Sequence, residues 1–207
     1  MVSKLSTGKK RYAFIDVQNT ASTTQQMLGF LIDWSKLCRY LKENWQCEEV
    51  FLYSGIENGD TATAEEFEKI TKEHSCVVRA KTVFAYKNPD KNLQTKCREC
   101  QAENVVVVDM GYRKKSNCDV ELSVDAVERA GPGSEFLILT GDGDFSYLIQ
   151  NAIDKGTKVY LVSNAGRYQK SGITKSRFST KFRQLIAQNT GKLTMIDIKS
   201  WKEKIKK

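Results

Sequence analysis

The sequence is poor in the residues that several classes of protein depend on. Its 207 residues include only two prolines and one histidine, His74. The shortage of proline argues against long structureless linkers, and a single histidine at the end of a polar segment argues against acid–base catalysis by histidine. Six scattered cysteines are too few for a disulfide-stapled scaffold, so reduced thiols in a cytoplasmic protein are expected.

Long apolar runs are also lacking. No stretch approaches the length of a membrane span, and residues 1–11 lack the apolar core of a secretion signal. We therefore expect a soluble protein with no membrane partner. Hydrophobic residues make up 40% of the chain, which is enough for a core, and 207 residues suit one domain.

Short apolar runs alternate with helical patterns along the chain. Strands are expected at residues 12–16, 50–53, 77–86, 105–110, 136–140, 159–162 and 193–198. Helices are expected at residues 34–45, 62–74, 119–130, 145–153 and 179–188. This alternation predicts an α/β, Rossmann-like parallel β-sheet with helices on both faces. Residues 87–115 are expected to form an insertion or a hairpin that extends the sheet.

Two expected strands end in acidic residues. Asp16 closes the first, and Asp142 follows a later one within Gly141-Asp142-Gly143-Asp144. If the two strands are neighbours where the strand order reverses, Asp16 and Asp142 converge there. The glycines allow a sharp turn and leave room for a ligand. Clustered carboxylates need a cation, and oxygen ligands favour Mg²⁺ or Mn²⁺.

A third acid, Asp119, begins an expected helix. Helical projection places it at the edge of a face formed by leucine, alanine and three valines, where an unpaired acid is costly. The same projection turns Asp125 towards the opposite, solvated side. Each acid alone could equally be a helix cap or a turn residue, and only the three segments together favour a metal site.

Three segments together resemble the NYN domain, in the LabA-like branch of the PIN-like nuclease superfamily. They are Phe14-Ile15-Asp16-x-x-Asn19, then the run from Asp119 to Ala126, then the run from Leu139 to Phe145. The similarity covers residues 10–165, leaving 166–207 as a basic C-terminal extension packed on the same domain. It implies a PIN-like fold and an endoribonuclease dependent on Mg²⁺ or Mn²⁺.

The resemblance also implies roles for individual residues. Metal-binding catalytic acids would be Asp16, Asp119 and Asp142, with Asp144 a catalytic residue close by. Asn19 would orient Asp16 or touch the substrate, and Thr140 would place a hydroxyl beside the site. Asp125 matches the family pattern too, although helical projection turns it away from Asp119.

Charge distribution favours a polyanionic partner. The net charge is +8, and residues 155–196 contain no aspartate or glutamate. We expect this tract, together with basic residues just before Asp119, to bind RNA, which we expect to be single-stranded. A solvated basic face is the alternative. The substrate-binding residues expected from charge are Arg167, Lys170, Arg177, Lys114 and Lys115.

Cys97 and Cys100 have the spacing of half a zinc site. Cys76 and Cys118 could complete it, but inert thiols are the favoured interpretation over structural Zn²⁺. For the whole chain, the main prediction is a metal-dependent endoribonuclease. The alternative is a non-catalytic RNA-binding module that keeps the acidic cluster, and a homodimer is possible. An aspartate-nucleophile phosphatase fits poorly, because Asp16 lacks a second acid two residues on.

Overall fold

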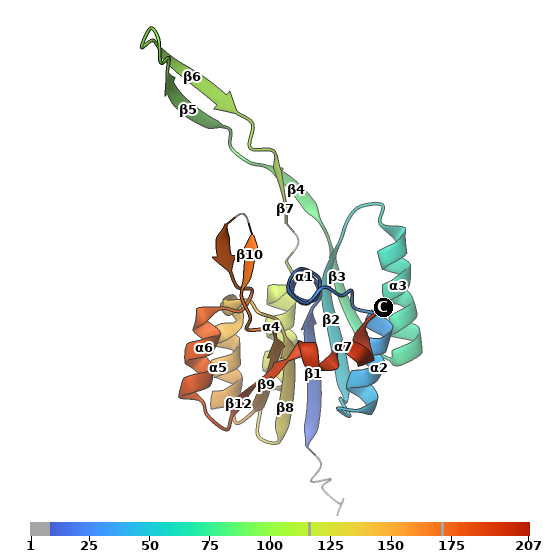
Figure 1. Ribbon diagram of the computed structural model, residues 1–207. Coiled ribbons are helices and arrows are strands. Elements are labelled where there is room, and N and C mark those ends of the chain that lie inside the picture. Colours follow the sequence, from blue (N-terminus) through green and yellow to red (C-terminus); the bar gives the residue numbers. More distant parts are fainter. Residues whose placement is uncertain (1–8, 116, 171) are drawn as a thin grey trace, which may run out of the picture.

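A six-stranded parallel sheet forms the centre of the molecule, in the order β12-β9-β8-β1-β2-β3 (Figure 1). The structure is a computed structural model that describes residues 9–115, 117–170 and 172–207, without the side chains of residues 114, 115 and 170. The six strands are β1 (Lys10–Asp16), β2 (Glu49–Ile56), β3 (Val77–Thr82), β8 (Ser134–Leu139), β9 (Lys158–Ser163) and β12 (Leu193–Asp197).

Helices cover both faces of this sheet, which makes the fold α/β as the sequence predicts (Figure 1). Along β1, Ala13 and Ile15 point into one core, and Tyr12 and Phe14 into the other. The first core is closed by α1 (Val17–Leu28), α2 (Trp34–Glu43), α3 (Thr61–His74), a 3-10 turn η2 (Ile198–Trp201) and α7 (Lys202–Ile205). The second is closed by α4 (Asp119–Arg129), η1 (Gly143–Phe145), α5 (Ser146–Asp154) and α6 (Thr180–Gln188).

The strand order reverses between β1 and β8. From β1 the chain proceeds outward through β2 and β3, then returns to place β8 on the other side of β1 before β9 and β12. Ile15 is in register with Leu139, so the ends of these two strands lie side by side. This is the switch point at which open α/β sheets bind ligands. It brings together the segments that follow Ile15 and Leu139.

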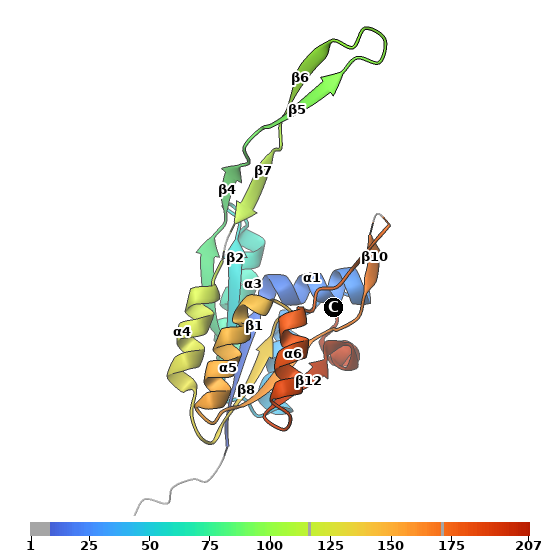
Figure 2. The same ribbon diagram turned by 90° about the vertical axis from the view of Figure 1, so that its left-hand side faces the viewer.

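Two hairpins project from the carboxyl edge of the sheet (Figure 2). The long one, here called the arm, spans residues 83–115 and contains β4 (Phe84–Lys87), β5 (Lys91–Lys96), β6 (Glu103–Val108) and β7 (Tyr112–Lys115). The short one contains β10 (Tyr168–Lys170) and β11 (Ile173–Lys175). The arm does not extend the central sheet: β4 pairs only with β7, and β5 only with β6, among the described residues.

Candidate functional site

A cleft of about 580 Å³ opens at the carboxyl edge, above the switch point. The ends of β1 and β2, the beginnings of α1, α3 and α4, and the turn after β8 contribute to its walls. Polar side chains dominate this lining. Among the predicted site residues, the cleft is lined by Asp16, Asn19, Asp119, Asp142 and Arg177.

Asp16 lies deepest in this group and is held by two neighbours. One carboxylate oxygen accepts a hydrogen bond from the backbone N–H of Asn19 (3.1 Å), which makes Asp16 the N-cap of α1. The other accepts from the Thr140 hydroxyl (3.0 Å). Burial raises the pKa of Asp16 from 3.8 to about 6, the two hydrogen bonds oppose this, and repulsion from Asp119 and Asp142 adds to it.

Asn19 and Thr140 join the two strand ends to each other. The side-chain oxygen of Asn19 accepts a hydrogen bond from the backbone N–H of Gly141 (2.8 Å). The Thr140 hydroxyl, which donates to Asp16, also accepts from the backbone N–H of Asp142 (3.2 Å). These contacts fix the turn that carries Asp142 relative to Asp16. The structure thus gives Asn19 and Thr140 positioning contacts.

Asp119 reaches the cleft from the beginning of α4. Asn117 binds it twice, since its oxygen accepts from the Asp119 backbone N–H (2.7 Å) and its amide donates to the Asp119 carboxylate (2.7 Å). Burial raises the pKa of Asp119, Asn117 opposes the shift, and the charges of Asp142 and Asp144 add to it. Sequence reasoning missed Asn117, which precedes the N-cap residue Cys118 and whose side chain accepts from the first backbone N–H of α4.

Asp144 stands apart from the other three acids. Its carboxylate is 79% exposed and lies 3.4 Å from the Lys181 ammonium group. Asp142 instead caps η1 by accepting from the Asp144 backbone N–H (3.0 Å) and faces the cleft. Asp144 is near enough to influence the pKa of Asp119, but it is not among the residues that line the cleft.

The three lining acids do not form a closed cage. Among the residues that the structure describes, no three histidine, cysteine, aspartate or glutamate side chains lie close enough to hold a metal ion together. Such a spacing still fits Mg²⁺, which keeps several waters and is bound through one or two carboxylates plus substrate phosphate. The raised pKa values of Asp16 and Asp119 indicate negative charge that a cation would stabilise.

The glycines of the Gly-Asp-Gly-Asp motif make room for the protein's own chain and not for a ligand. A Cβ atom at Gly141 would collide with the backbone carbonyl oxygen of Arg177, and one at Gly143 with the Ser179 side chain. Residues 177–179 therefore close directly over the motif. This packing brings Arg177 to the cleft wall, where its guanidinium donates to the Gln26 side chain (2.7 Å).

The acid-free basic tract divides between the two ends of the sheet. Arg167 is exposed at the base of the short hairpin, on the cleft side. Lys155 and Lys192 lie at the opposite edge, because they precede the parallel strands β9 and β12. Only part of the tract can therefore line a path to the acids. The predicted substrate-binding side chains of Lys114, Lys115 and Lys170 lie outside the described part of the structure.

The predicted orientation of α4 is correct for Leu122 and Ala126, which are buried, but wrong for its valines and for Asp125. Its valines are exposed, with Val120 at 68%, whereas Asp125 is 6% exposed and inward-facing. Asp125 accepts hydrogen bonds from the Tyr53 hydroxyl (2.9 Å) and from the Arg79 guanidinium (3.2 and 3.3 Å). The helical projection failed because it assigned valines to the core and aspartates to the surface. A carboxylate that accepts hydrogen bonds can instead be buried. Tyr53 lines the cleft, so Asp125 supports its floor.

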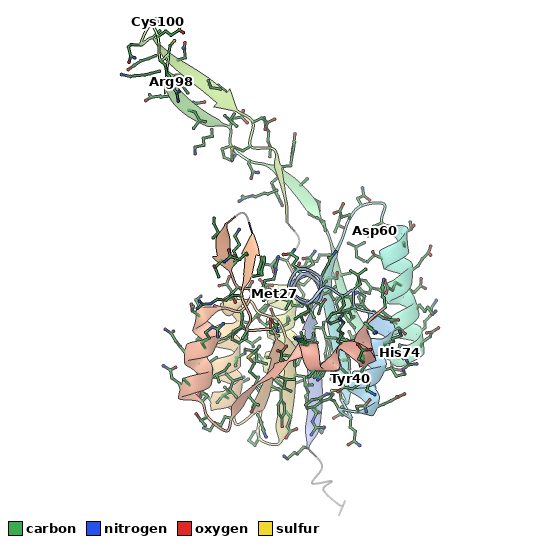
Figure 3. The ribbon with its side chains drawn as sticks, viewed as in Figure 1. Met27, Tyr40, Asp60, His74, Arg98 and Cys100 are labelled. Atoms are coloured by element: carbon green, nitrogen blue, oxygen red, sulfur yellow. The ribbon has the colours of Figure 1, made fainter. Side chains whose placement is uncertain are left out.

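A four-cysteine zinc site within one chain is excluded by position. Cys76 and Cys118 are buried in the two cores of the body. Cys100 lies at the far end of the arm (Figure 3). Phe178 and Phe182 occupy core positions, since both are at most 3% exposed.

Comparison with known families identifies the domain. The family described as "NYN domain" matches residues 11–179, most of the chain. The chain belongs to the NYN domain family. NYN domains are members of the PIN-like nuclease superfamily, so this NYN domain has the fold of that superfamily. The match runs past residue 165, and the division of the chain at that position stays a prediction.

One solved structure supports the fold of this NYN domain. A protein of unknown function, VPA0982 from Vibrio parahaemolyticus RIMD 2210633, is 20% identical with a TM-score of 0.59, over 96% of this chain and 98% of that one. Phosphofructokinase-2 from Escherichia coli in complex with potassium is 13% identical with a TM-score of 0.33, over 63% and 40%. The second superposition is too poor to bear on function. No curated protein matches the chain. None of the described helices is long and apolar enough to cross a membrane.

Proposed function

We propose that this NYN domain, as a LabA-like endoribonuclease, hydrolyses RNA phosphodiester bonds with a divalent cation, Mg²⁺ or Mn²⁺, held by Asp16, Asp119 and Asp142. The observation that carries the proposal is the convergence of these acids, from three separate elements, on one cleft at the switch point. Burial raises the pKa of Asp16 and Asp119, and the charges of the neighbouring acids add to both shifts. Without a bound cation, these buried carboxylates, which repel one another, would destabilise the fold.

The cation, when bound, supplies positive charge that makes water a better nucleophile and stabilises the phosphate as charge builds on it. Asp16 and Asp142 would bind it from the two strand ends, and Asp119 would reach it from across the cleft through water that the ion retains, because the three acids are too far apart to ligate one ion directly. Asn19 and Thr140 would hold the two strand ends in place through their hydrogen bonds. Asp144 would act from outside the cleft through its charge, because its carboxylate is exposed.

RNA would enter between the two hairpins that project from the carboxyl edge (Figure 2). Arg177 lines the cleft itself, and Arg167 stands at the base of the short hairpin. Lys170 on β10 and Lys114 and Lys115 on β7 belong to the same two hairpins. These cations would neutralise phosphates on either side of the acids, and a single strand would pass more easily than a duplex. All six cysteines are free, which fits a reducing cytoplasm.

Cleavage of labelled single-stranded RNA in Mn²⁺ tests the proposal. Wild type should cut, while chelation, Asp16→Asn and Asp142→Asn should each abolish cutting and leave the fold intact, because the substitution removes charge and keeps shape. Glu128→Gln, on the solvated side of α4, is the matched control and should cut normally. Binding without cutting by wild type in both Mg²⁺ and Mn²⁺ would favour the non-catalytic RNA-binding module.

A further inference from the structure

Among the described residues, the strands of the arm pair only with one another. The arm consists of two successive two-stranded ribbons that lead away from the body (Figures 1 and 2). Two-stranded hairpins alone are marginally stable, and contiguous exposed apolar surface typically marks an interface. Apolar side chains on the arm that are 39% to 68% exposed are Phe84, Tyr86, Leu93, Val105, Val106, Val107, Met110 and Tyr112.

The tip of the arm presents two cysteines in a fixed geometry. The Cys97 backbone N–H donates to the Ala102 carbonyl (3.0 Å), and the Gln101 N–H donates to the Cys97 carbonyl (3.0 Å), which closes a tight loop. The Cys97 sulfur accepts hydrogen bonds from the backbone N–H groups of Cys100 and Glu99 and from the Cys100 thiol. The Cys97 and Cys100 side chains therefore lie next to each other at the tip, and Cys-x-x-Cys is a spacing that zinc sites use.

One arm supplies only half of a thiolate metal site. Structural Zn²⁺ takes four ligands in a tetrahedron, and Cys-x-x-Cys pairs typically supply two of them. Over the described residues, no third histidine, cysteine, aspartate or glutamate side chain joins this pair. The other four cysteines, Cys38, Cys47, Cys76 and Cys118, are buried in the two cores of the body. A four-ligand zinc site at the tip would therefore need its other two ligands from outside the chain.

We propose that Cys97 and Cys100 bind Zn²⁺ together with the same pair from a second copy of the chain, joining two chains at the tips of their arms. An identical copy supplies the required two thiolates by symmetry, in a closed two-fold contact. The four thiols release four protons to solvent, leaving a site with two negative charges. Arg98 and Glu99, which both lie between the two cysteines, carry opposite charges and do not change the net charge of the site (Figure 3).

The exposed apolar side chains of the arm support the choice of a second copy as the occupant. Val105 and Val107 share one face of the β5–β6 ribbon, while Leu93 and Val106 share the other, because residues in register lie on the same side. If Zn²⁺ joins the tips of two arms, the apolar side chains of one arm can pack against the same side chains of the other arm. The apolar surfaces of both arms then become buried. Metal ligation and apolar contact would then stabilise the same dimer.

Cobalt titration of the full chain tests this proposal. The protein is kept reduced, stripped of metal and titrated with Co²⁺ in excess Mg²⁺, because thiolate–cobalt absorption reports sulfur ligands and ignores the acidic cleft. Wild type should bind one Co²⁺ per two chains and sediment as a dimer that a chelator converts to monomer. Cys97→Ser and Cys100→Ser should abolish the absorption and the dimer. The control is Cys47→Ala, at a thiol buried in the body, which should behave as wild type.

Three outcomes would overturn the proposal. Absence of thiolate–cobalt absorption in wild type would remove the metal site. Full absorption from a monomer, with one ion per chain, would place the missing ligands elsewhere and dispense with the second copy. A dimer that survives both chelation and the two serine substitutions would assign self-association to another surface. Because cleavage is measured separately with Mg²⁺ or Mn²⁺, these results are independent of the nuclease proposal.

Discussion

At the scale of single residues, Asp16 connects the site to stability. Burial raises its pKa from 3.8 to about 6. Between these pH values the folded carboxyl keeps a proton that the unfolded one has lost, so stability falls as pH rises through this window and stays lower above it. The shift corresponds to at most about 3 kcal/mol at neutral pH.

We predict that Asp16→Asn stabilises the metal-free protein above pH 6. Asparagine removes the cost of a buried charge, so the free energy of unfolding should rise by up to about 3 kcal/mol at pH 7.5. The gain should shrink towards zero as pH falls below 4. Urea unfolding across this pH range measures it, with exposed Asp144→Asn as the control. A gain that is independent of pH would show that charge is not its cause.

Asp125 provides a second prediction, concerning support beneath the cleft. Asp125→Asn should lower the free energy of unfolding by about 1–3 kcal/mol, because the Arg79 guanidinium loses its charged partner and the hydrogen bond from Tyr53 weakens. Chemical denaturation compares it with Glu128→Gln, an exposed acid on the same helix, which should change little. Equal stabilities of the two variants would reject the supporting role of Asp125.

At the scale of elements, the glycine motif depends on the segment that covers it. Gly141→Ala should destabilise the protein by about 1–3 kcal/mol, since its Cβ displaces the Arg177 backbone. It should also weaken RNA binding by moving Arg177. Gly131→Ala is the matched control, because a Cβ there meets nothing within 4 Å and its φ is not positive. Thermal unfolding and RNA affinity check both effects, and similar behaviour of the two variants would argue against this account.

Some elements follow from the sequence and others do not. Strands β1, β2, β8 and β9 were predictable because each is a continuous apolar run, which fits a strand buried on both faces. Helix α1 was missed because its buried side is largely threonine, with the Thr20 hydroxyl bonded to the Leu139 carbonyl (2.9 Å). Apolar periodicity cannot reveal a helix buried through hydroxyl groups.

The arm shows a different limit of sequence reasoning. The run of four valines from Val105 to Val108 is typical of a strand in the core. Residues 105–107 are nevertheless exposed, on a ribbon outside the central sheet. Local pattern predicts that a segment is extended, but not which strand it pairs with or what covers it. The convergence of Asp16, Asp119 and Asp142 could be predicted from the sequence, because each acid lies at the end of a strand or the beginning of a helix.

At the scale of the whole molecule, the distribution of charge predicts where RNA binds. Arg167→Glu with Arg177→Glu should weaken binding of single-stranded RNA and lower its salt dependence by about 0.7 in logarithmic slope for each phosphate that is no longer neutralised. Lys155→Glu with Lys192→Glu makes the same change in net charge at the opposite edge. It should leave affinity nearly unchanged. Fluorescence anisotropy at several salt concentrations distinguishes them, and equal losses of affinity in both double variants would indicate non-specific attraction.

The most direct test of the central claim is Mn²⁺ binding by wild type and Asp16→Asn, followed by electron paramagnetic resonance of the free ion at pH 7.5. If Asp16, Asp119 and Asp142 hold a divalent cation, the wild type should bind Mn²⁺ in the absence of RNA. The variant should bind it about tenfold or more weakly, since one carboxylate ligand has lost its charge. Equal affinity in both proteins, or no binding by the wild type, would contradict a cation site at the switch point.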